Sequence, residues 1–145
     1  MSWIKDRVAN LTRKYKTNDP FELASMMNIQ VIPHNFHEEI NGFYKYDRRN
    51  KYIFINSNLS DENQLFVCGH ELGHAVLHPR ANTPFLRKNT FVSVDRLEVE
   101  ANRFAIELLI NKDYLTESIS IYELTRLCGI PNELAYLIKA NFFGK

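Results

Sequence analysis

The sequence is short of the features that mark secreted, membrane and disulfide-rich proteins. Its two cysteines, Cys68 and Cys128, lie far apart and form no Cys-x-x-Cys pair, so we expect reduced, buried thiols. No apolar run approaches the ~20 residues that a membrane-spanning helix requires. The N-terminal residues also lack the apolar stretch of a signal peptide. These absences predict a cytoplasmic protein that makes no contact with a membrane.

The sequence also has no large excess of charge of either sign. The chain of 145 residues carries 18 Lys and Arg against 17 Asp and Glu, so its formal net charge is +1. Binding to duplex DNA needs clustered cations that meet phosphates, so we expect no direct contact with nucleic acid. Five glycines and five prolines form no linker, and 45% of the residues are hydrophobic. The composition therefore predicts one domain, residues 1–145, built around one core.

The most informative segment is a His-Glu-x-x-His sequence at His70, Glu71 and His74. On a helix, residues four apart lie on one face, so the two imidazoles can converge on one metal ion. Neutral imidazoles leave zinc Lewis-acidic, and a neighbouring carboxylate can take a proton from a water whose pKa zinc lowers to about 7. The pattern predicts a hydrolytic zinc site in which His70 and His74 are ligands and Glu71 is the general base.

The flanking residues matter because two histidines and a glutamate can fall at this spacing by chance. An apolar stripe at helical spacing comprises Leu65, Phe66, Gly69, Leu72, Gly73, Val76 and Leu77. Ser60 is a suitable N-cap, and Pro79 disfavours helical conformation in the residue before it. We therefore expect a helix over about residues 61–78, with one buried side.

A zinc site of this kind needs a third protein ligand, and the residues after the motif exclude one arrangement. A metzincin would carry a glycine and a third histidine where this chain has Leu77 and Arg80. His78 continues the four-residue spacing from His74. However, four residues advance about 6 Å along a helix, so three such histidines cannot easily share one tetrahedral ion. We expect His78 to be structural or to lie in the outer shell of the site.

Two glutamates in the next helical segment, residues 95–110, are candidates for the third ligand. The buried stripe of this segment comprises Leu97, Ala101, Phe104, Ala105, Leu108 and Leu109. Glu100 lies on the edge of the stripe, and an acid that faces a core needs a partner such as a metal ion. Glu98 competes for the role, but Asp95 and Glu98 match a capping box, which gives Glu98 a structural function. This argument favours Glu100, keeps Glu98 as the alternative and places Glu107 on the solvated surface.

The rest of the sequence predicts an α+β fold. A helical pattern over residues 3–15 is followed by a second helix, which Asp19 caps and Pro20 opens. Residues 30–32 are typical of a strand, and residues 40–46 and 51–56 are typical of an antiparallel hairpin. Residues 80–94 show no clear period, so we expect a connector there.

A helical C-terminal subregion is expected over about residues 117–145. Ser120 and Glu123 form a capping box, Gly129 ends that helix, and Pro131 opens another. A helix, a turn and a helix can bind DNA, but three acidic side chains in this subregion balance three basic ones. Packing, or a contact with another protein, is the better interpretation.

The two motif segments, HELGHAVLH at residues 70–78 and EVEANRFAIELL at residues 98–109, resemble the ImmA/IrrE metallo-endopeptidases of bacteria, phages and integrative elements. The resemblance extends to residues 19–22 and to the hairpin, so it covers nearly the whole chain. It implies a small zincin-like domain with helices packed on a short antiparallel sheet and the motif on the central helix. It also implies one Zn²⁺ per chain, gluzincin-type ligands His70, His74 and Glu100, and Glu71 as the catalytic base. One departure is Asn111, where the family commonly has a proline.

The resemblance implies a function as well: cleavage of a helix-turn-helix transcriptional repressor, which derepresses phage or mobile-element genes. The alternative is a non-cleaving antirepressor, a protein-binding module whose zinc site is only structural. The presence of Glu71 favours the peptidase, since a structural site has no use for a general base. The sequence distinguishes neither the substrate nor the group that stabilises the oxyanion.

Overall fold

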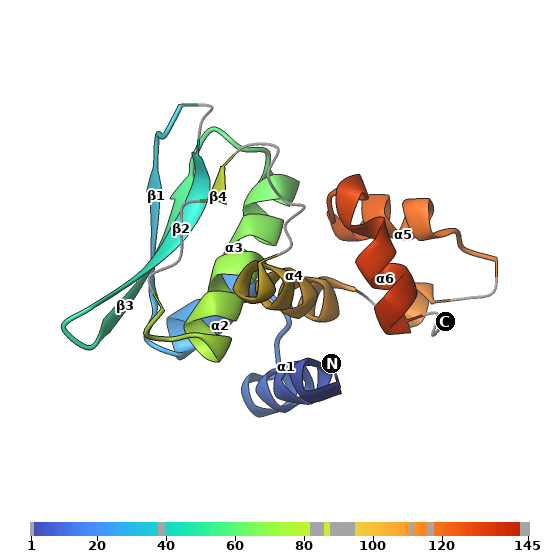
Figure 1. Ribbon diagram of the computed structural model, residues 1–145, viewed down its shortest axis with the longest axis horizontal. Coiled ribbons are helices and arrows are strands. Elements are labelled where there is room, and N and C mark those ends of the chain that lie inside the picture. The colour runs from blue at the N-terminus through green and yellow to red at the C-terminus, as the bar shows by residue number, and fades with distance from the viewer. Residues whose placement is uncertain are drawn as a thin grey trace.

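The computed structural model describes residues 2–37, 40–81, 86–87, 95–110, 112–115 and 118–142. Within these ranges the chain forms α-helices on one side of a sheet, which confirms the α+β prediction (Figure 1). The elements are α1 (Ser2–Tyr15), α2 (Pro20–Met26), β1 (Gln30–His34), β2 (Ile40–Asp47), β3 (Asn50–Asn56), α3 (Asp61–Leu77), β4 (Leu86–Arg87), α4 (Arg96–Leu109), η1 (Lys112–Tyr114), α5 (Ile121–Cys128), η2 (Asn132–Leu134) and α6 (Ala135–Phe142). No helix among them is long and apolar enough to cross a membrane.

The sheet is mixed, with strand order β1-β3-β2-β4: the predicted short antiparallel sheet is present as β3-β2-β4, and β1 is added to it as a parallel strand. The hairpin β2–β3 is antiparallel as expected, and Phe43 pairs with Phe54 in it. β1 pairs with β3 and not with β2. The chain reverses direction twice between β1 and β3, once before β2 and once in the hairpin. β1 and β3 therefore run in the same direction, and their pairing is parallel. The two-residue β4 falls in the predicted connector, whose residues 82–85 and 88–94 lie outside the described residues.

Helix α3 lies between the sheet and α4 (Figure 1). It extends over Asp61–Leu77, and the Oγ atom of Ser60 accepts a hydrogen bond from the Asn63 backbone at its N-terminus. The predicted helix is thus confirmed to within one residue. The core between α3 and the sheet includes Ile53, Ile55, Val67 and Leu72, and Phe104 of α4 belongs to the same hydrophobic cluster. This packing fixes the direction of α3 and therefore of every side chain on its other faces.

Helices α3 and α4 pack antiparallel through small residues. A Cβ atom at Gly73 would lie 3.1 Å from Ala101 Cα, and one at Gly69 would lie 3.3 Å from Ala105 Cβ. Two glycines one turn apart therefore face two alanines one turn apart, and the helix backbones approach closely. This approach brings the N-terminal turns of α4 beside the C-terminal half of α3, where the motif histidines lie.

The C-terminal helices form a second hydrophobic cluster with the C-terminal end of α4. Leu124, Leu134, Leu137 and Ile138 are buried there beside Phe66 of α3. Ser120 caps α5, and Gly129 ends it in the left-handed conformation at φ 71°. The helices predicted before and after this glycine are present as α5 and α6.

Substitution of Gly73 by alanine tests the helix approach. In a solvent-exposed helix this change would stabilise by about 1 kcal/mol, because alanine is the better helix former. Here the new Cβ meets Cα and O of Ala101, both at 3.1 Å, and these backbone atoms yield only if α4 moves. We expect urea unfolding of the metal-free variant to show a loss of about 1–3 kcal/mol. Gly69→Ala is the control and should cost less, because its new Cβ would lie 3.3 Å from Ala105 Cβ and 3.5 Å from the nearest backbone atom. A Gly73→Ala protein as stable as wild type would contradict the packing.

Candidate metal centre

Three motif side chains meet on one face of α3. His70, Glu71 and His74 are each 1% exposed, although histidine and glutamate usually reach solvent. Their potential ligand atoms all lie within 4.8 Å of one another. Burial of three ionisable groups at one point costs free energy unless a charge or a metal ion compensates them. The cluster therefore has the character of a binding site more than of a core.

Helix α4 adds a fourth side chain, and it is Glu98. Its Oε1 atom lies 3.3 Å from Nε2 of His70, and its Oε2 atom lies 2.7 Å from Nε2 of His74. Asp95 caps α4 by accepting hydrogen bonds from the backbone N–H groups of Leu97 and Glu98. The Glu98 carboxylate itself turns toward α3.

Glu100, which the sequence favoured as the third ligand, is not brought to the two motif histidines. Its Oε1 atom lies 2.7 Å from Nε2 of His78, at the C-cap of α3. The capping argument misled because Asp95 caps the helix with its own side chain, and the helix packing directs Glu98 at the imidazoles. Glu98, the alternative from the sequence, is the carboxylate that the structure places between His70 and His74.

The outer ring nitrogens of both histidines also have partners. Nδ1 of His70 lies 2.7 Å from Oδ1 of Asn102, and Nδ1 of His74 lies 3.1 Å from Nδ1 of His78. An amide oxygen only accepts, so Nδ1 of His70 carries a proton that it donates to Asn102, and Nε2 is the nitrogen that faces Glu98. Sequence reasoning missed Asn102. The available signal was a polar residue inside an apolar stripe, four residues after Glu98 and so on the same face of α4.

Burial and the contacts of Glu98 with the imidazoles together set the pKa values in the cluster. Desolvation raises the pKa of Glu71 to about 7 and lowers the pKa of His74 to about 4. Burial alone would also raise the pKa of Glu98, but the adjacent imidazoles of His70 and His74 hold it well below its ordinary value. For His70, burial is outweighed by Glu98 and the charge of Glu71, so its pKa is raised. A neutral His74 beside an ionised Glu98 is the protonation state that a metal ion requires of its ligands.

The donor atoms fit a divalent metal ion. Oε2 of Glu71 and Oε2 of Glu98 are buried and hydrogen-bond to no residue that the structure describes, although Oε2 of Glu98 lies close to His74. Ligands of a tetrahedral zinc ion lie about 3.3 Å apart, given bonds of about 2.0–2.1 Å. The separation of Glu98 from Nε2 of His70, 3.3 Å, matches this value, and the separation from Nε2 of His74, 2.7 Å, is that of a direct hydrogen bond, which a bound ion would replace. Two imidazoles and one carboxylate can thus hold such an ion and leave a position open for water or substrate.

The predictions for the two cysteines and for Glu107 have different outcomes. Cys68 and Cys128 are buried and not joined by a disulfide, as predicted, and burial raises the pKa of the Cys68 thiol well above its ordinary value. The placement of Glu107 on the solvated surface is wrong, because this residue is 7% exposed. Helix α1 packs on α4 and, with Lys5 and Lys112 nearby, covers its side chain.

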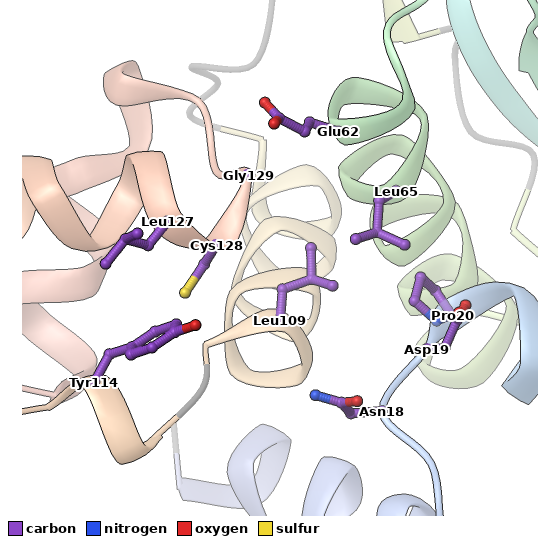
Figure 2. A pocket seen from close by; sticks show the side chains of 10 residues that line it. All are labelled: Asn18, Asp19, Pro20, Glu62, Leu65, Leu109, Tyr114, Leu127, Cys128 and Gly129. Atoms are coloured by element: carbon purple, nitrogen blue, oxygen red, sulfur yellow. The ribbon is translucent and has the colours of Figure 1, made fainter.

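A cavity of about 330 Å³ lies where the N-terminal end of α3 meets the C-terminal ends of α4 and α5 (Figure 2). Its walls include Asp19, Glu62, Leu65, Leu109, Tyr114 and Leu127. Because α3 and α4 run antiparallel, Leu65 and Leu109 lie at the other end of the helix pair from His74 and Glu98. The cavity is therefore a separate feature of the surface, distinct from the metal centre.

Comparison with known proteins gives matches across the motif helices. A peptidase family model described as IrrE N-terminal-like domain matches residues 24–129. The "Uncharacterized immunity region protein 2" of Bacillus phage phi105 is 56% identical over 138 residues, which cover 92% of this chain and 87% of that protein. The "Metallopeptidase ImmA" of Bacillus subtilis (strain 168) is 31% identical over 116 residues, which cover 80% of this chain and 68% of that protein.

The raised pKa of Glu71 makes a prediction for the protein stripped of metal by a chelator. A carboxyl whose pKa is about 7 when folded and 4.5 when unfolded binds more protons in the folded state, so its contribution to stability falls as pH rises from 4.5 to 7. Glu71→Gln removes this penalty. Urea unfolding should show that the variant gains about 2 kcal/mol relative to wild type between pH 5 and pH 8. A stability difference that does not change with pH would contradict the assignment.

Proposed function

Because the chain belongs to the ImmA/IrrE family of metallopeptidases, we propose that it is a zinc-dependent endopeptidase that cleaves a helix-turn-helix transcriptional repressor. Cleavage would derepress genes of a phage or mobile element. The single observation that carries the catalytic part is the Glu98 carboxylate set against both motif imidazoles, with Glu71 buried beside them. The choice of a repressor as substrate is supported by the name of the similar phage protein, which assigns that protein to an immunity region.

In this proposal His70, His74 and Glu98 hold one Zn²⁺ per chain. Their inner atoms are two imidazole Nε2 atoms and a carboxylate, a donor set that suits zinc and leaves it Lewis-acidic. The Nδ1–H of His70 donates to Asn102, which fixes the ring with its Nε2 lone pair inward. Glu100 is left out of the ligand set because its carboxylate is engaged with His78.

Glu71 has the properties of a general base. When bound, zinc would polarise the scissile carbonyl and acidify a water molecule. Glu71 follows a ligand directly in the sequence, and its Oε2 atom is buried without a hydrogen-bond partner among the described residues. A carboxylate whose pKa is about 7 is a stronger base than an ordinary glutamate. It can take the proton from the attacking water and pass it to the leaving amine.

One observation favours a stable protein contact and keeps the binding-module alternative as a second candidate. Large apolar side chains are exposed on the C-terminal elements: Tyr114 is 40% exposed, Tyr122 67%, Leu127 55% and Tyr136 49%. Two of these residues, Tyr114 and Leu127, line the cavity of Figure 2. Exposed apolar side chains that share one cavity, as Tyr114 and Leu127 do, often mark a protein-binding surface. Such a surface would serve a peptidase that docks a folded substrate and equally an antirepressor that only sequesters one.

The ligand assignment predicts a ranking of zinc retention. His70→Ala, His74→Ala and Glu98→Ala each remove a proposed ligand, so each protein should lose stoichiometric zinc after dialysis, as measured by atomic emission. Glu100→Ala should retain more zinc than Glu98→Ala, because Glu100 does not contact the inner nitrogens. Folding of each variant is checked by circular dichroism. If Glu98→Ala keeps zinc while Glu100→Ala loses it, Glu100 is the ligand.

The peptidase proposal is tested by Glu71→Gln, which keeps the shape of the side chain but accepts no proton. Wild-type protein should shorten the repressor encoded beside its gene and raise expression from the repressed promoter. Zinc-loaded Glu71→Gln should lose nearly all cleavage and derepression and still bind the repressor. Mass spectrometry of the repressor and a promoter reporter, at equal protein levels, give the two readouts. Equal derepression by both proteins, with the repressor intact, would favour the binding module instead.

A further inference from the structure

His78 and Glu100, which have no role in the proposed function, lie behind His74 with largely buried side chains. Nδ1 of His74 lies 3.1 Å from Nδ1 of His78, and Nε2 of His78 lies 2.7 Å from Oε1 of Glu100. The side chains of His78 and Glu100 are 8% and 9% exposed, so both contacts are largely shielded from water. Glu100, His78 and His74 thus form a continuous chain that ends at a proposed metal ligand.

The direction of the hydrogen bonds among Glu100, His78 and His74 follows from the groups at the two ends of the series. A carboxylate only accepts, so the hydrogen bond to Glu100 requires a proton on Nε2 of His78. In the structure, Nε2 of His74 lies 2.7 Å from the Glu98 carboxylate and donates to it. A metal ion bound at this nitrogen would require a lone pair there, so the proton of His74 would be on Nδ1. Nδ1 of His78, which keeps its own proton on Nε2 toward Glu100, can accept that N–H across the 3.1 Å contact.

The position of His78 explains why this residue can serve His74. It is the C-cap of α3, with φ −134° and ψ 57°, so it has left helical geometry while its backbone N–H still donates to the carbonyl of His74. The backbone of His78 therefore keeps its helical position on the face of His74, while its changed φ turns the side chain away from the usual helical direction. Its ring reaches back to the ring of His74, with the centroids 5.4 Å apart.

We propose that His78 and Glu100 are positioning residues that fix the tautomer and orientation of His74 and thereby raise the affinity of the site for metal. The inference rests on the proposed ligand role of His74. It assigns to this pair the function that Asn102 has for His70 on the other side of the cluster. Removal of such outer partners of a ligand histidine typically lowers metal affinity 10- to 100-fold.

The chain offers a matched control for this inference. Glu107 lies on the same helix as Glu100 and is equally buried, at 7% exposure for each. It lies near the other end of α4, beside Lys5 and Lys112, and has no contact with the histidines. A general loss of stability from removal of a buried glutamate on α4 should therefore appear in both Glu100→Ala and Glu107→Ala. A loss of metal affinity should appear only in the first.

The test is a double-mutant cycle on zinc affinity, measured by competition with a chromophoric chelator and without any substrate. We expect Glu100→Ala and His78→Ala each to weaken zinc binding 10- to 100-fold, Glu107→Ala to leave it unchanged, and Glu100→Gln, which retains an acceptor oxygen, to lose less than Glu100→Ala. Because Glu100 acts through His78, the double variant should bind zinc as His78→Ala does. The visible d–d bands of Co²⁺ bound in place of zinc should shift in Glu100→Ala but not in Glu107→Ala.

Three outcomes would overturn the positioning role. The losses of zinc affinity could multiply in the double variant, or Glu100→Ala and Glu107→Ala could lose equal affinity. The third is that His78→Ala, Glu100→Ala or both lose no affinity. Multiplied losses would show that Glu100 acts on the metal without His78. Failure of the ligand assignment is a distinguishable result, because it would appear as zinc retention by His74→Ala or Glu98→Ala.

Discussion

The close approach of α3 and α4 sets the geometry on which the rest of the site depends. Gly69 and Gly73 face Ala105 and Ala101 at distances that leave little room for larger side chains. Small residues at a helix interface let the two backbones come together, and the antiparallel direction then decides which ends meet. The first turns of α4 consequently lie beside the last turns of α3. This is why a glutamate 28 residues after His70 in the sequence reaches its imidazole.

Packing of this kind also creates an electrostatic requirement. It buries Glu71, Glu98 and two histidines, and it leaves one oxygen of each carboxylate without a hydrogen bond among the described residues. Unsatisfied buried carboxylate oxygens are costly, and a cation that binds between them removes that cost. The same burial raises the pKa of Glu71 toward neutrality, which makes it a more effective base. The burial that makes Glu71 a more effective base therefore also lowers the stability of the metal-free protein.

The features that sequence predicted best are those with local causes. Helix α3 was expected over residues 61–78 and extends over Asp61–Leu77, since its N-cap Ser60 and its terminating Pro79 act on the adjacent backbone. The left-handed Gly129 likewise ends α5 where predicted. The features that it did not predict concern contacts between distant segments. A strand pattern does not reveal that β1 pairs with β3, and helical periodicity of α4 does not reveal that α1 covers Glu107. The choice between Glu98 and Glu100 likewise depends on which α3 side chain lies opposite each glutamate, and a sequence pattern does not reveal that.

The central claim is that His70, His74 and Glu98 converge on a single zinc ion. Anomalous diffraction at the zinc absorption edge, from crystals of the zinc-loaded protein, tests it most directly. We expect one peak per chain, about 2.0–2.2 Å from Nε2 of both histidines and from a carboxylate oxygen of Glu98. Glu100 and His78 should stay hydrogen-bonded to each other, outside the ligand shell. A zinc ion coordinated by Glu100 or His78, with Glu98 turned away, would contradict this claim.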